Sequence, residues 1–120
     1  MLQRLLPKLL IPLALLVAPM SAEAHAILLD STPAVNGTVA GPHVAVTLRY
    51  NSRIDRGRSR LNLTLPDQSI QVLPIAESAA EDQLTSTAEL APGSYSLRWV
   101  VLAVDGHLSR GDVPFTVTGN

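Results

Sequence analysis

The sequence has no cysteine and few aromatic residues. Its 120 residues include one tryptophan, one phenylalanine, two tyrosines and no cysteine. Without thiols the chain cannot form disulfides, catalytic thiolates, cysteine-type zinc sites or iron-sulfur clusters. The scarcity of aromatic side chains argues against a flat sugar-binding face. Stability must therefore come from apolar packing without covalent cross-links.

The longest apolar stretch is short and lies near the amino terminus. Arg4 and Lys8 flank a leucine-rich opening, and Leu9–Met20 is apolar apart from two prolines. This stretch is shorter than the roughly 20 residues that a membrane-spanning helix needs. A charged start, a short apolar stretch and Ala22-Glu23-Ala24 are typical of a secretory signal peptide cleaved after Ala24. We expect residues 1–24 to be removed and residues 25–120 to form one exported domain of 96 residues (120 less 24), without stable membrane insertion.

Residues 25–120 do not have a strong net charge of either sign. Nine Lys and Arg less Arg4 and Lys8 leave seven, and ten Asp and Glu less Glu23 leave nine, so the net charge is −2 with neutral histidines. Proteins that bind nucleic acid usually have a strongly basic face. A nucleic-acid partner is therefore not expected.

Apolar and polar residues alternate along several short segments, which is typical of half-buried strands. Shorter strands are expected near 25–30, 70–72 and 84–90. A sustained apolar spacing of three and four residues is absent, so no substantial helix is expected. About seven strands separated by turn residues predict an all-β domain, either an antiparallel sandwich or a Greek-key barrel. The clearest alternating sets are Val44, Val46, Leu48 and Tyr50; Leu61, Leu63 and Leu65; Tyr95, Leu97, Trp99 and Val101; and Val113, Phe115 and Val117.

Three residues have side chains suited to a metal ion. Cleavage after Ala24 would make His25 the first residue, with its α-amine and ring Nδ1 able to chelate one ion. Asp105 and His107 are two residues apart, and in an extended chain such side chains project from one face. Asp105-Gly106 alone indicates only a tight turn. Together, three nitrogens and one carboxylate oxygen suit Cu(II).

Residues 25–120 resemble the CopC (PcoC) family of periplasmic copper-binding proteins. The resemblance rests on His25-Ala26, Ser31-Thr32-Pro33-Ala34, Leu90-Ala91-Pro92-Gly93-Ser94-Tyr95, and the stretch from Trp99 through Asp105-Gly106-His107 to Gly111. It implies a cupredoxin-like Greek-key β-barrel that carries one Cu(II) ion in copper resistance or homeostasis. The implied ligands are His25, Asp105 and His107. An inner-membrane CopD-like copper transporter is the implied partner, and we expect a monomer.

The chain departs from the family pattern at two places. Some members have a methionine-rich Cu(I) site, whereas Met1 and Met20, the only methionines here, lie in the predicted signal peptide. Many members have Phe-Ser-Glu where this chain has Tyr50-Asn51-Ser52. An acid at that place would support metal ligands from outside the coordination shell, so the affinity or rigidity of the site depends on what replaces it.

Other polar residues have less specific interpretations. His43 could be a fourth protein ligand, but it has no soft or acidic donor beside it in the sequence and is interpreted as a surface histidine. Four arginines (Arg53, Arg56, Arg58 and Arg60) are predicted to lie in a solvated loop between two strands. The alternative for these arginines is a docking patch for an acidic partner or for lipid head groups.

Two other classes of function remain as alternatives to a copper carrier. Lytic polysaccharide monooxygenases also hold copper through an N-terminal histidine, but a ligand such as Asp105 would fill a position that oxygen chemistry needs open. An exported immunoglobulin-like interaction module would need no metal. A hydrolytic triad of Asp105, His107 and Ser109 is not supported, because the chain has no Gly-x-Ser-x-Gly motif. We therefore expect no enzymatic activity.

Overall fold

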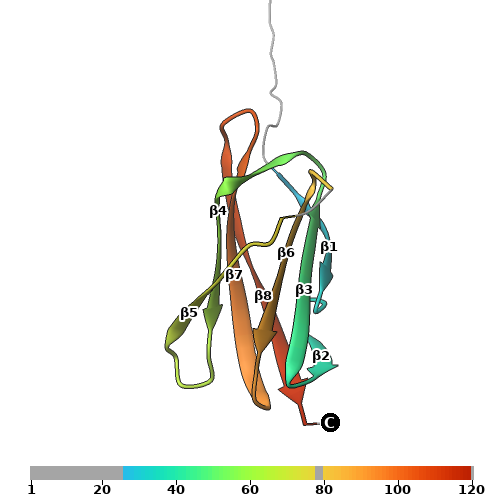
Figure 1. Cartoon of the computed structure of the whole chain (residues 1–120), viewed down its shortest axis with the longest axis vertical. Coiled ribbons are helices and arrows are strands. Elements are labelled where there is room, and N and C mark those ends of the chain that lie inside the picture. Colours follow the sequence, from blue (N-terminus) through green and yellow to red (C-terminus); the bar gives the residue numbers. More distant parts are fainter. Residues whose placement is uncertain (1–25, 78–79, 120) are drawn as a thin grey trace, which may run out of the picture.

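The computed structural model describes residues 26–77 and 80–119, which form eight strands and no helix (Figure 1). The predicted all-β domain is confirmed. The strand beyond the predicted seven is β2. The strands are β1 (Leu28–Thr32), β2 (Gly37–Ala40), β3 (His43–Tyr50), β4 (Ile54–Thr64), β5 (Ile70–Leu73), β6 (Gln83–Glu89), β7 (Gly93–Ala103) and β8 (Leu108–Thr118).

The strands form two sheets that pack face to face as a β-sandwich (Figure 1). One sheet has the order β1-β3-β6, and the other has the order β2-β8-β7-β4-β5. Neighbouring strands are antiparallel, except that β2 pairs with β8 in parallel. Within the part of the chain that the structure describes, no helix is long and apolar enough to cross a membrane.

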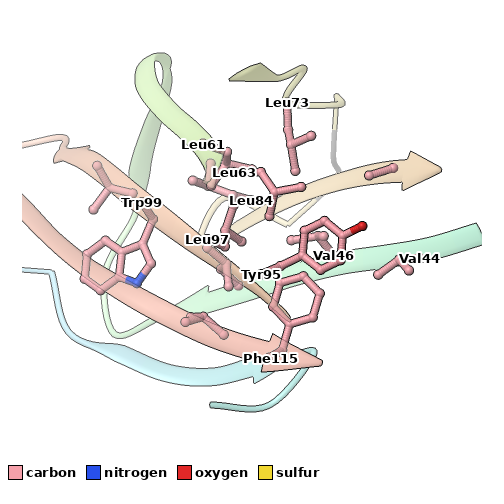
Figure 2. Close-up of a cluster of buried hydrophobic side chains, with 14 of the residues drawn as sticks. Val44, Val46, Leu61, Leu63, Leu73, Leu84, Tyr95, Leu97, Trp99 and Phe115 are labelled. Atoms are coloured by element: carbon pink, nitrogen blue, oxygen red, sulfur yellow. The ribbon is translucent and has the colours of Figure 1, made fainter. Parts of the chain in front are cut away.

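The core lies between the inner faces of the two sheets (Figure 2). Leu48 and Leu84 from the smaller sheet, and Leu61 and Leu97 from the larger one, have no exposed surface. The alternating apolar residues of β3, β7 and β8 are buried as predicted, because every second side chain of a strand faces the opposite sheet. Burial between two sheets therefore accounts for the stability of a domain without disulfides.

The indole of Trp99 packs over Gly111, its direct cross-strand neighbour on β8. A Cβ atom at Gly111 would lie 2.4 Å from Cζ2 of the indole, so only glycine leaves room for the ring. The ring of Tyr50, on β3, meets the indole edge to face with centroids 5.3 Å apart. Burial raises the pKa of the Tyr50 phenol, which keeps it neutral. The aromatic pair thus joins the two sheets.

The prediction that the four arginines lie in a loop was wrong. Arg56, Arg58 and Arg60 belong to the first half of β4, and only Arg53 precedes the strand. The pairing of β4 with β7 is irregular between Asp55 and Arg60, where the buried position is occupied by Ser59. The Ser59 hydroxyl donates to the carbonyl of Asp55 (2.7 Å) and accepts the Leu102 N–H (3.3 Å). Because a serine fills that position, the segment lacks the apolar alternation that indicates a strand.

We expect Gly111→Ala to lower the free energy of unfolding by about 1–3 kcal/mol, because the new methyl group overlaps the Trp99 indole and must displace it. Gly57→Ala is the matched control, since its Cβ would meet only Asp55 Oδ1, at 3.6 Å. Chemical denaturation of both variants measures the difference. Equal stability of the two variants would show that the indole is not held against β8.

Candidate metal centre

Asp105 and His107 lie in the turn between β7 and β8, not on an extended strand. β7 ends at Ala103 and β8 begins at Leu108. The Ala103 N–H donates to the carbonyl of His107 (2.9 Å), and the Gly106 N–H donates to the carbonyl of Ala103 (2.8 Å). Gly106 has a φ of 96°, a conformation that favours glycine. The turn indicated by Asp105-Gly106 is confirmed, whereas the expectation that strand alternation would align the two side chains was wrong.

The turn itself brings the two side chains together. Asp105 Oδ1 accepts the backbone N–H of His107 (3.2 Å), the usual way in which an aspartate stabilises a turn two residues ahead. The same oxygen lies 3.5 Å from Nδ1 of the His107 ring. The Asp105 side chain is 50% exposed and the His107 side chain 58% exposed. A carboxylate oxygen and an imidazole nitrogen therefore stand side by side at the surface.

The first described residue, Ala26, is held against β8 close to this pair. Its N–H donates to Oγ of Ser109 (3.1 Å), and its side chain is buried. Ser109 is two residues beyond His107. His25 lies outside the described residues, but the Ala26 nitrogen is the atom to which it is bonded. The first described residue therefore lies beside Ser109 of β8, two residues after His107 in the sequence.

Asn51 holds the next residue of the amino-terminal segment. The Ile27 N–H donates to Oδ1 of Asn51 (2.8 Å), and the Asn51 N–H donates to the carbonyl of Ile27 (3.0 Å). Asn51 lies in the β3–β4 connection, where the carbonyl of Arg53 accepts the N–H of Val104 in the β7–β8 turn (3.2 Å). The beginning of β1, this connection and the turn share one end of the sandwich, and the end of β8 lies at the other (Figure 1). In the sequence, Asn51 stands out only as part of a departure from the family pattern, and no local signal indicates these contacts.

Asp105 and His107 are two donors of a possible site, not a complete one. Across residues 26–77 and 80–119, no group of three or more His, Cys, Asp or Glu side chains could hold a metal ion. An imidazole nitrogen and a carboxylate oxygen suit Cu(II), Ni(II) or Zn(II), but a further donor must come from elsewhere. The three-residue site with His25 remains a prediction.

His43 lies at the start of β3, whereas Tyr50, at the end of that strand, lies toward the end of the sandwich that carries Asp105 and His107. It is exposed, as predicted, but the sequence did not reveal its partner. Glu89 is its cross-strand neighbour on β6, and Oε2 of Glu89 pairs with Nδ1 of His43. Because both side chains are largely exposed, this ion pair contributes little to stability. His43 is therefore a suitable control histidine.

The chain is similar to copper resistance proteins in sequence. The family model described as the CopC domain matches residues 28–118. Protein YobA of Escherichia coli K12 is 36% identical over 107 residues, which cover 85% of each chain. Copper resistance protein C of Xanthomonas campestris pv. juglandis is 29% identical over 110 residues, 84% of this chain and 86% of that one. The resemblance inferred from the sequence is confirmed.

Solved structures show the same fold. CopC from Methylosinus trichosporium OB3b superposes with a TM-score of 0.71 and 28% identity, over 80% of this chain and 96% of that one. PcoC from Escherichia coli has a TM-score of 0.66 at 24% identity, over 79% of this chain and all of that one. At that identity the likeness to PcoC concerns the fold alone.

We expect Gly106→Ala to destabilise the domain by about 1–2 kcal/mol, because its φ of 96° is strained for alanine. The space itself is open, since no atom beyond the two neighbouring residues lies within 4 Å of the added Cβ. Denaturant unfolding should show a smaller loss for Gly106→Asn, because asparagine tolerates positive φ better. If alanine cost no more than asparagine, the backbone of this turn would not be the constraint.

Proposed function

This chain belongs to the CopC family, and on that premise we propose that it is a periplasmic, non-catalytic Cu(II) carrier or buffer in copper resistance and homeostasis. The sequence similarity to copper resistance protein C supports copper as the metal. The observation that carries the proposal is the hydrogen bond from Ala26 to Ser109. It brings the attachment point of His25 to the strand that follows the Asp105–His107 pair.

The proposed site forms after signal peptidase removes residues 1–24. His25 then supplies its α-amine and ring Nδ1, Asp105 supplies a carboxylate oxygen, and His107 supplies an imidazole nitrogen. One Cu(II) ion per chain accepts these donors, because tetragonal nitrogen and oxygen sets suit Cu(II), which binds most tightly among the divalent ions of its row. The short Asp105–His107 distance of 3.5 Å supports this site, since both groups are already on one side of the turn.

Cu(II) fits the available donors better than Cu(I). Soft thioether and thiolate ligands select Cu(I). The chain has no cysteine, and its two methionines, Met1 and Met20, are lost with the signal peptide. PcoC, by contrast, is described as a methionine-rich copper resistance protein. Transfer of Cu(I) between two sites on one molecule is therefore not part of this proposal.

The same donor set favours transport over oxidation. A copper oxidase needs an open coordination position for oxygen or substrate. Asp105, next to His107, would occupy such a position, and the chain has only four aromatic residues with which to build a sugar-binding face. We propose that the monomer exchanges Cu(II) with an inner-membrane copper transporter of the CopD type.

Cu(II) titration of the chain beginning at His25 should give one ion per chain and a nitrogen-rich tetragonal electron paramagnetic resonance signal. One extra N-terminal alanine, or retention of residues 1–24, converts the His25 amine into an amide and should weaken binding at least about tenfold. Asp105→Ala and His107→Ala should also weaken it, whereas His43→Ala should not. Equal affinity of the precursor and the processed chain would disprove the chelate.

Cu(II) affinity should fall as the pH is lowered from about 8 to about 5, because protons and copper compete for the same lone pairs. In model peptides, α-amine and imidazole nitrogens take up protons between about pH 6 and 8. Competition with a chelator of known pH dependence measures the effect. An affinity that did not change over this interval would exclude amine and imidazole ligands.

A further inference from the structure

We propose that Asn51 is a positioning residue, whose side chain holds the amino-terminal segment so that His25 can reach the metal with Asp105 and His107. This inference rests on the proposed function. It assigns to Asn51 a role in metal affinity, although its side chain need not touch the metal. The basis is a set of hydrogen bonds that converge on the two residues following His25.

The contacts of Asn51 replace strand pairing where that pairing stops. β1 and β3 pair from Thr32↔Thr47 to Leu28↔Tyr50, with an irregularity between Leu28 and Asp30. Beyond Leu28 the chain is held by Asn51, whose Oδ1 accepts the Ile27 N–H (2.8 Å) and whose own N–H donates to the Ile27 carbonyl (3.0 Å). Both backbone polar groups of Ile27 are thus held by one residue.

Side-chain burial alone does not fix this segment. Ile27 is 57% exposed and Leu29 is 50% exposed, so neither side chain gains much from packing. Ala26 is buried, but its methyl group is small. Chain termini usually fray unless something ties them down. Leu28 packs against the core, and the hydrogen bonds to Asn51 and Ser109 hold the backbone of the two residues before it.

Asn51 can act as a fixed reference because its own segment is anchored on both sides. The Tyr50 N–H donates to the carbonyl of Asp82 (2.8 Å), and the Ile54 N–H donates to the carbonyl of Glu81 (2.9 Å). Two residues after Asn51, the carbonyl of Arg53 accepts the Val104 N–H (3.2 Å) next to Asp105. One short connection thus contacts both the amino-terminal segment and the turn that carries the other two ligands.

Holding a chelating residue in place before the metal arrives raises affinity, because less conformational entropy is lost on binding. Residues that orient metal ligands in this way typically change affinity by about 10–100-fold when removed. An asparagine side chain is long enough to reach the Ile27 N–H while its backbone N–H bonds the same residue. The departure from the family pattern at Asn51 therefore has a specific consequence for the site.

The test compares Asn51→Ala with Asn51→Asp. Alanine removes the acceptor for the Ile27 N–H, whereas aspartate keeps an oxygen in the same place. We expect Asn51→Ala to weaken Cu(II) binding about tenfold, to alter the copper resonance signal and to speed hydrogen exchange at the Ile27 amide. Asn51→Asp should leave the Cu(II) affinity, the resonance signal and the exchange rate as they are in the unsubstituted chain. Gln71→Ala, which removes an exposed amide on β5, is the matched control and should change nothing.

A double-mutant cycle with His25→Ala separates positioning from general stability. His25→Ala removes the ring but leaves the α-amine of residue 25, so if Asn51 acts through His25, Asn51→Ala should weaken Cu(II) binding less in that background than in the unsubstituted chain. An equal loss with and without that ring would overturn the inference, as would unchanged copper binding in Asn51→Ala. In both cases the proposed function stands, provided that His25→Ala weakens binding. If the unsubstituted chain binds no copper, or His25→Ala leaves binding unchanged, both proposals are wrong.

Discussion

The arrangement of the end of the sandwich that carries Asp105 and His107 depends on the ladder between β7 and β8. These strands pair in continuous register from Gly93↔Val117 to Leu102↔Leu108, with the Trp99 indole lying over Gly111. The ladder holds the turn with Asp105 and His107 at a fixed place. It also presents Ser109 on the inner face, where the hydroxyl receives the Ala26 N–H. One hairpin thus positions two predicted ligands and the entry point of the third.

The parts of the fold that follow an alternating pattern could be predicted from the sequence, and two parts could not. β2 has only four residues and gains its partner, β8, by a parallel pairing between segments distant in the chain, which leaves no local signal. The first half of β4 could not be predicted as a strand for a different reason. Its buried position is taken by Ser59, which forms hydrogen bonds with backbone groups where the pairing of β4 with β7 is irregular. The arginines around Ser59 are also polar, so the segment lacks the alternation of apolar and polar residues that indicates a strand.

For the candidate site, the sequence indicated that Asp105 and His107 lie close together but gave the wrong reason for it. Asp105 and His107 were found from their spacing and from the family resemblance, but a turn stabilised by the Asp105 carboxylate brings them together, not an extended strand. The hydrogen bonds of Asn51 and Ser109 to the amino-terminal segment were not predicted, because a side chain that bonds a distant backbone group leaves no periodicity in the sequence. Glu89, the partner of His43, was missed for a similar reason, since cross-strand neighbours depend on register.

The core of the domain is separate from the Asp105–His107 pair, and this separation suits a carrier. Structural metal sites are usually closed, and domains built on them unfold without the metal. Here the apolar residues between the sheets form a continuous core, whereas the Asp105 and His107 side chains are half exposed at one end. On the proposed function, copper would join the amino-terminal segment to the β7–β8 turn without being needed for the fold. Because the donors are exposed, another protein's ligands could reach the ion and replace them one at a time, which is what transfer requires.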